Sequence, residues 1–162
     1  MGLVAQKMKP KIQNILGTHN KQPKWDKIIK AWAGSSGYLA DGMNAAGQQT
    51  ISVSGFADAG QKINEIMKKN RKSGAAVPGK VAKEIAKCMD TYTSTYQTTI
   101  VTAPAFFALL GSLEKAMAAP TTSKTKMTND LVKALDNYSK AVMVAGIIPG
   151  SPPVPFGPAP LT

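Results

Sequence analysis

Apolar residues recur at helical spacing along most of the chain. The clearest pattern covers residues 24–33, where Trp25, Ile28, Ile29 and Trp32 follow the i, i+3, i+4, i+7 spacing of one helix face. Comparable spacing predicts further helices at residues 3–16, 56–70, 78–99, 104–117 and 128–143. The chain is therefore expected to be all-α, an irregular bundle of about five to six helices.

Proline and threonine positions indicate where these helices begin and weaken. Pro10 is expected to break or kink the first helix. Pro78 suits the first turn of its helix, and Thr128 is expected to cap the last helix at its N-terminus. The threonine-rich residues 91–102 weaken the far end of the helix over 78–99, because β-branched residues are poorer helix formers.

Two shorter stretches have a different pattern. Residues 38–46 are rich in Gly and Ala, so they form either a second small helix packed through small side chains or a loop. Residues 48–54 include an alternating run from Thr50 to Ser54, which is typical of a strand. A short β-hairpin or strand near 48–54 is therefore a possible addition to the helical bundle.

The composition changes abruptly after Gly146. Residues 147–162 contain six prolines and two glycines. Because proline fixes φ and has no N–H, such a segment is not expected in a helix or a central strand, and an extended, polyproline-like arm is predicted. The chain thus divides into a helical domain over residues 1–146 and an extended arm over residues 147–162.

The arm is expected to lie across a neighbouring subunit. A stiff backbone loses little conformational entropy on binding, and Val154 and Phe156 would anchor it. The alternative is a disordered tail without a role, and a segment folded back on its own body would contradict the interpretation. The predicted partner-binding residues are Ile147, Ile148, Pro149, Pro152, Pro153, Val154, Pro155, Phe156, Pro158, Pro160 and Leu161.

The chain is strongly basic. It has 162 residues with 20 Lys and Arg against 9 Asp and Glu, a formal charge of +11, and residues 1–30 and 62–87 each contribute +6. This field attracts nucleic acid, anionic lipid or an acidic protein surface, although a solvated lysine face is the simpler alternative. The predicted basic patch comprises Lys7, Lys9, Lys11, Lys68, Lys69, Arg71 and Lys72. Because 19 of the 20 bases are lysine, only nucleic-acid contact without sequence specificity is supported.

One stretch resembles a phosphate-binding loop. Residues 74–81 match G-x-x-x-x-G-K, but Val81 replaces the hydroxyl that binds magnesium and Pro78 removes an N–H donor. The stretch is interpreted as a Gly/Pro turn into a helix.

Cysteine, histidine and carboxylate positions do not assemble a catalytic motif. Cys88 lies on an apolar helix face and is interpreted as a core residue rather than a nucleophile activated by His19. One cysteine and one histidine exclude a disulfide framework or a zinc finger within this chain. The nine carboxylates are scattered. No enzyme activity, cofactor, metal site or small-molecule substrate is therefore expected.

The sequence does not predict a membrane protein. A basic start followed by a long apolar stretch, as in a signal peptide, is not found at residues 1–7. The most apolar run, residues 103–113, is far shorter than the roughly 20 residues of a membrane span. We expect a chain that is made in a cytosol and stays soluble or joins an assembly.

The last helix and arm, with the sequence AVMVAGIIPGSPP at residues 141–153, resemble the minor structural proteins of contractile-tailed bacteriophages, in particular small tail and baseplate components. The resemblance implies a non-enzymatic virion subunit, assembled in the host cytoplasm, that bridges other virion structural proteins in several symmetry-related copies. It carries over no individual residue roles. The alternative interpretation is a basic nucleic-acid-binding accessory protein.

Overall fold

A computed structural model describes residues 2–17, 24–47, 56–69, 77–93, 98–100, 103–117 and 124–162. In chain order these residues form the 3-10 turn η1 (Ala5–Lys7), helices α1 (Lys9–Gly17) and α2 (Trp25–Ala33), the 3-10 turn η2 (Tyr38–Asp41), helices α3 (Phe56–Lys69) and α4 (Val77–Thr93), strand β1 (Thr98–Ile100), helices α5 (Ala103–Met117) and α6 (Lys124–Ala141), and strands β2 (Met143–Ile148) and β3 (Val154–Pro160). The predicted helical bundle is confirmed. The strand expected near 48–54 lies outside the described residues.

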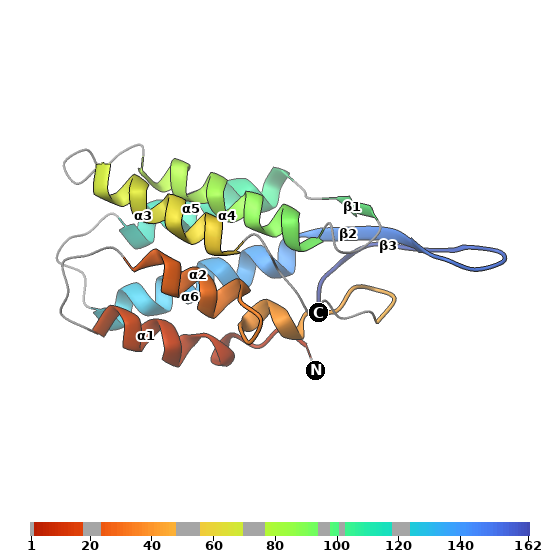
Figure 1. The fold of residues 1–162 in the computed structure, drawn as a ribbon, viewed down its shortest axis with the longest axis horizontal. Coiled ribbons are helices and arrows are strands. Elements are labelled where there is room, and N and C mark those ends of the chain that lie inside the picture. The colour runs from red at the N-terminus through yellow and green to blue at the C-terminus, as the bar shows by residue number, and fades with distance from the viewer. Residues whose placement is uncertain are drawn as a thin grey trace.

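The six helices pack in a closed circle that follows their order in the chain. Each helix packs against the next one, and α6 packs against α1 as well as α5. Figure 1 shows two layers, with α3, α4 and α5 above α1, α2 and α6, and the helices run lengthwise in alternating directions. As a result, α2, α4 and α6 begin at one end of the molecule, and the sheet lies at the opposite end.

Apolar faces of all six helices meet in one core. The face of α2 predicted from the sequence is confirmed, because Trp25, Ile28, Ile29 and Trp32 are all buried. The largest fully buried side chains are Trp32, Tyr38, Tyr138, Met8, Ile12, Ile28, Ile29, Leu39, Ile63, Ile85 and Met89. Burial of such side chains is the main stabilising contribution to a bundle of this kind.

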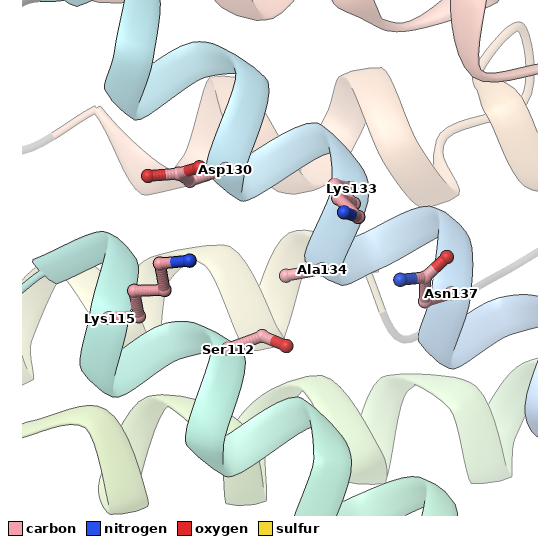
Figure 2. A pocket seen from close by; sticks show the side chains of 6 residues that line it. All are labelled: Ser112, Lys115, Asp130, Lys133, Ala134 and Asn137. Atoms are coloured by element: carbon pink, nitrogen blue, oxygen red, sulfur yellow. The ribbon is translucent and has the colours of Figure 1, made fainter.

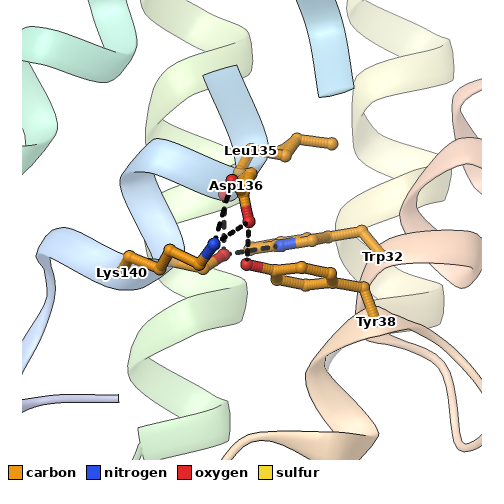
Figure 3. Close-up of polar contacts among 6 residues, drawn as sticks. Trp32, Tyr38, Leu135, Asp136 and Lys140 are labelled. Atoms are coloured by element: carbon orange, nitrogen blue, oxygen red, sulfur yellow. Dashed lines mark hydrogen bonds and ion pairs between the residues drawn. The ribbon is translucent and has the colours of Figure 1, made fainter. Parts of the chain in front are cut away.

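Polar contacts fix α6 against α2 and η2 (Figure 3). Trp32 Nε1 donates a hydrogen bond to Ser139 Oγ at 2.9 Å, and Ser139 Oγ donates to the carbonyl oxygen of Leu135 at 2.7 Å. The Tyr38 hydroxyl donates to Asp136 Oδ1 at 2.5 Å. Because a buried indole N–H without a partner is costly, the Trp32–Ser139 bond specifies one position of α2 along α6.

The three strands form an antiparallel sheet in the order β1-β2-β3. Thr98 pairs with Ala145, and Ile148 pairs with Val154 at the far end of the β2–β3 hairpin. Within β3, Gly157 has a φ of +69°, and a β-carbon there would collide with the carbonyl oxygen of Val144. Glycine is therefore the residue that this register allows.

The predicted helix ends differ from the structure at four positions. Pro10 lies in the first turn of α1 and so begins the helix instead of kinking it, and buried Thr128 lies inside α6 instead of capping it. The helix expected over 78–99 ends at Thr93, and the helix expected over 128–143 ends at Ala141. In the last two cases β-branched residues beyond the helix pair in the sheet, a contact between distant segments that local spacing cannot reveal.

The proline-rich segment is extended, as predicted, but it is paired and not a separate arm. The sequence predicted that no part of residues 147–162 would lie in a central strand. This is wrong for Ile147 and Ile148, which belong to the central strand β2, whereas the proline-containing β3 is an edge strand. Leu161 is only 2% exposed, and Thr162 and Met43 exchange two backbone hydrogen bonds of 3.0 and 2.9 Å. The base of the hairpin is thus folded onto the chain's own body, which contradicts the expectation of an arm that lies wholly across a neighbour, while the tip projects from the body (Figure 1).

Candidate interaction surfaces

Charge-free segments meet at the sheet end of the molecule. Residues 42–57, 91–113 and 141–162 contain no Asp, Glu, Lys or Arg. Their described parts come together because β1 pairs with β2, Met43 pairs with Thr162, and α5 begins just after β1 (Figure 1). We call this surface the neutral end, and it comprises Gly42–Gly47, Thr98–Ile100, the first two turns of α5 and Met143–Thr162.

Three of the four large hydrophobic side chains that are exposed in the described chain lie at the neutral end, and the fourth, Val4, lies in the N-terminal segment beside it. The four are Val4, Phe107, Ile147 and Val154, which are 55%, 66%, 48% and 54% exposed. Phe107 lies in the second turn of α5, and Ile147 and Val154 lie on the hairpin. Val4 follows Gly2, where an added β-carbon would lie 3.1 Å from the carbonyl carbon of Thr162. An uncharged surface with exposed apolar side chains has the composition of a protein interface core.

The structure divides the predicted partner-binding residues into three groups. The exposed group is Ile147, Pro149, Pro152, Pro153, Val154, Pro155, Pro158 and Pro160. Ile148 and Phe156 are half-buried, and Phe156 packs against the core. Leu161 is buried, so its assignment to a partner surface is wrong, because its side chain stabilises the body of the same chain.

The outer edge of β3 is poor in hydrogen-bond donors. Pro155, Pro158 and Pro160 are three of its seven residues. A strand added to a sheet needs backbone N–H groups on the edge that it joins, and proline has none. A partner would therefore contact the side chains of the hairpin and would not extend the sheet from β3.

Lysines gather at the opposite end of the bundle, where α2, α4 and α6 begin and α3 and α5 end (Figure 1). We call this surface the basic end. Its exposed lysines are Lys27, Lys68, Lys69, Lys80, Lys115 and Lys126. Among the described residues, Lys126 forms an ion pair with Asp130 at 3.4 Å, whereas Lys68, Lys69 and Lys80 form none. None of the exposed large hydrophobic residues of the described chain lies here.

The predicted basic patch is not one surface. Lys7 precedes α1 and pairs with Asp41 at 2.7 Å, and Lys11 donates to the carbonyl oxygen of Ser36 at 3.0 Å. These contacts place Lys7 and Lys11 beside the chain that follows α2, with Lys9 between them in the sequence, whereas Lys68 and Lys69 lie in the last turn of α3 at the basic end. Arg71 and Lys72 lie outside the described residues. Sequence order alone does not show which helix ends meet.

A small open pocket between α5 and α6 is a candidate ligand site (Figure 2). It has a volume of ≈ 140 Å³ and is lined by Ser112, Lys115, Asp130, Lys133, Ala134 and Asn137. Ligand pockets are commonly larger, about 300–1,000 Å³, and mainly apolar. The side chains in Figure 2 come from facing sides of two helices, and the pocket fits a solvated groove between them.

The described residues that could have had a catalytic or phosphate-binding role mostly serve the fold. Cys88 is 1% exposed, and burial raises the pKa of its thiol to about 12, so the thiol stays protonated. Burial also raises the pKa of Tyr138, whose hydroxyl has no hydrogen-bond partner within the described chain. Val77 to Val81 form the start of α4, as expected for a turn into a helix. His19 lies outside the described residues.

Neither a metal-binding cluster nor a membrane-spanning helix is found in the described ranges. These residues contain no group of three or more His, Cys, Asp or Glu side chains that could hold a metal ion. Among the same residues, every helix is too short or too polar to cross a membrane.

Comparison with known proteins finds no family model, no curated protein and no solved structure that matches this chain. The interaction surfaces therefore rest on the residues and geometry of this chain.

Proposed function

We propose that this protein is a non-enzymatic structural subunit that docks on a neighbouring subunit through its neutral end. The observation that carries the proposal is the coincidence of two properties at one end. Three of the four exposed large hydrophobic residues of the described chain, Phe107, Ile147 and Val154, lie there, and the same surface is built from segments without charge. Charged residues are depleted and apolar residues enriched at the centre of protein interfaces.

The partner that fits the hairpin is a different protein with an apolar groove. The hairpin is a narrow projection, so its complement is concave (Figure 1). The pocket between α5 and α6 of this chain is lined by Lys115, Asp130 and Lys133, which do not suit Ile147 and Val154. Two bodies of charge +11 also repel each other, which disfavours a second copy as the partner.

The setting that we propose is a phage-like virion, in its tail or baseplate. The support is the resemblance of residues 141–153 to the ends of small phage tail components. In that setting the subunit would be present in several symmetry-related copies and would bridge larger structural proteins.

Point substitutions at the hairpin tip test this proposal better than truncation. Removal of residues 147–162 would also remove buried Leu161 and the pairing of Thr162 with Met43. The double variant Ile147→Ser, Val154→Ser instead changes two exposed side chains. The matched control is Gln13→Ser, Asn14→Ser, which changes two exposed residues of α1.

Incorporation into large complexes is the measurement. In native lysate separated by sedimentation, we expect the wild type and the control in a fast-sedimenting fraction and the hairpin variant mainly as a free monomer. A photoreactive residue at position 154, but not at position 133, should cross-link to one other protein. A wild-type chain that sediments only as a monomer would contradict the proposal, as would a cross-link from position 154 to a second copy of this chain alone.

A further inference from the structure

We infer that the basic end binds the phosphate backbone of nucleic acid, without sequence specificity. This second surface is separate from the neutral end and does not depend on the docking function proposed above. It differs from the predicted basic patch, because Lys7, Lys9 and Lys11 lie elsewhere and lysines from five helices replace them.

The folding of the chain concentrates these lysines. Lys68 and Lys69 end α3, and Lys80 lies in the first turn of the next helix, α4. The end of α3 and the start of α4 lie at the same end of the upper layer (Figure 1). Lys27 in the first turn of α2 and Lys115 in the last turn of α5 add charge from neighbouring helices of the circle. Five acidic residues, Asp26, Glu65, Glu84, Glu114 and Asp130, lie within four residues of the six exposed lysines of the basic end, which still outnumber them.

The composition of the basic end fits a polyanion better than a folded protein. A protein interface normally has an apolar or aromatic centre, and the described basic end exposes no large hydrophobic side chain. Nucleic-acid backbone contact needs only cations that neutralise phosphates and release counterions. The side chains are exposed, so they can reach phosphates without reorganising the core.

The residue type also limits what the surface can recognise. A lysine ammonium is a point charge on a flexible stem, whereas reading of a base edge typically uses the planar fork of arginine. The exposed cations of the described basic end are all lysines. The structure therefore favours binding that depends on salt and is indifferent to sequence.

The experiment measures the binding of a fluorescent DNA duplex of about 30 base pairs to the full chain over a series of salt concentrations. The test variant is Lys68→Gln, Lys69→Gln, Lys80→Gln. The matched control is Lys9→Gln, Lys11→Gln, Lys30→Gln, which removes the same charge from α1 and from the last turn of α2, away from the basic end. We expect the test variant to bind at least about tenfold more weakly at low salt, and the slope of log K against log salt to become shallower by about one for each lysine lost.

Several outcomes would overturn the inference. These are the absence of wild-type binding at low salt, an equal loss of affinity in the control variant, and a preference of more than about tenfold for one duplex sequence over unrelated ones. Soluble polyglutamate that displaces the duplex at equal charge concentration would assign the surface to acidic proteins instead. Loss of hairpin docking with DNA binding intact, or the reverse, separates this inference from the proposed function.

Discussion

The two ends of the bundle are built from the same helices but have opposite surface chemistry. At the neutral end, segments without charge expose Phe107, Ile147 and Val154. At the basic end, helix turns expose lysines and, over the described residues, no large hydrophobic side chain. The difference follows from the alternating direction of the helices, which brings segments that are distant in sequence to the same end.

This comparison separates two kinds of recognition. Contact through the neutral end would depend on burial of apolar area and shape, which salt weakens little. Contact through the basic end would depend on counterion release and would weaken steeply with salt. A net charge of +11 for the whole chain conceals this division, because the charge is not spread evenly over the surface.

The largest expected effect concerns the base of the hairpin. Leu161→Ala removes a side chain that is only 2% exposed, and we expect the free energy of unfolding to fall by about 2–5 kcal/mol. Chemical denaturation followed by circular dichroism measures this change. If the variant unfolds at the same denaturant concentration as the wild type, the hairpin base is not part of the core, and the neutral end is only a loosely attached tail.

A smaller effect on stability is expected at the hairpin tip, where Ile147 and Val154 are exposed. Ile147→Lys and Val154→Lys change exposed side chains, so each should alter the free energy of unfolding by less than about 0.5 kcal/mol. Each should nevertheless abolish incorporation into large complexes, because an unpaired charge would be buried in the interface. A loss of stability of several kcal/mol would show that the tip serves folding and would remove the distinction between tip and base.

The smallest expected effect concerns Asp90, in the last turn of α4 and just before the charge-free residues 91–113. Burial raises the pKa of its carboxyl above the ordinary value of 3.8. The native state therefore binds this proton more tightly than the unfolded state, and the associated stability is present below pH 3.8 and lost as the pH rises through the native pKa.

The substitution Asp90→Asn should remove the loss of stability that accompanies ionisation of this carboxyl. We expect the variant to match the wild type in acid and to be slightly more stable at neutral pH, as measured by thermal unfolding over a pH series. Glu84→Gln on the same helix is unsuitable as a control, because it breaks the ion pair with Lys87. Glu114→Gln, on the exposed side of α5, is the better one. A variant that is less stable than the wild type at neutral pH would show that the charged carboxylate stabilises the neutral end.

The sequence predicted the helices better than the contacts between segments. The spacing of Trp25, Ile28, Ile29 and Trp32 identified α2 and its buried face, because a helix face depends only on neighbouring residues. Thr98, Thr99 and Met143 were predicted as helix residues, but each is in a strand whose pairing joins residues more than 40 positions apart in the chain. Strand pairing of that kind is decided by the folded bundle and not by local propensity.

The candidate surfaces likewise combine local features, which the sequence predicts, with contacts between distant segments, which it does not. The proline-rich segment was identified from composition, but its pairing with β2 and the burial of Leu161 depend on the body against which it folds. The charge-free segments can be recognised in the sequence alone. That they meet at one end, and that Lys11 lies far from Lys68, can be known only from the direction of each helix in the folded bundle.

The attachment of the hairpin at both of its strands has a mechanical consequence. One strand continues from α6, and the other returns to Met43 through the backbone bonds of Thr162. A segment attached at one end restricts only the distance between its partner and the body. A hairpin attached through both strands also resists rotation, so a partner bound at the tip would be fixed in its orientation to the helical body as well as in its distance from it.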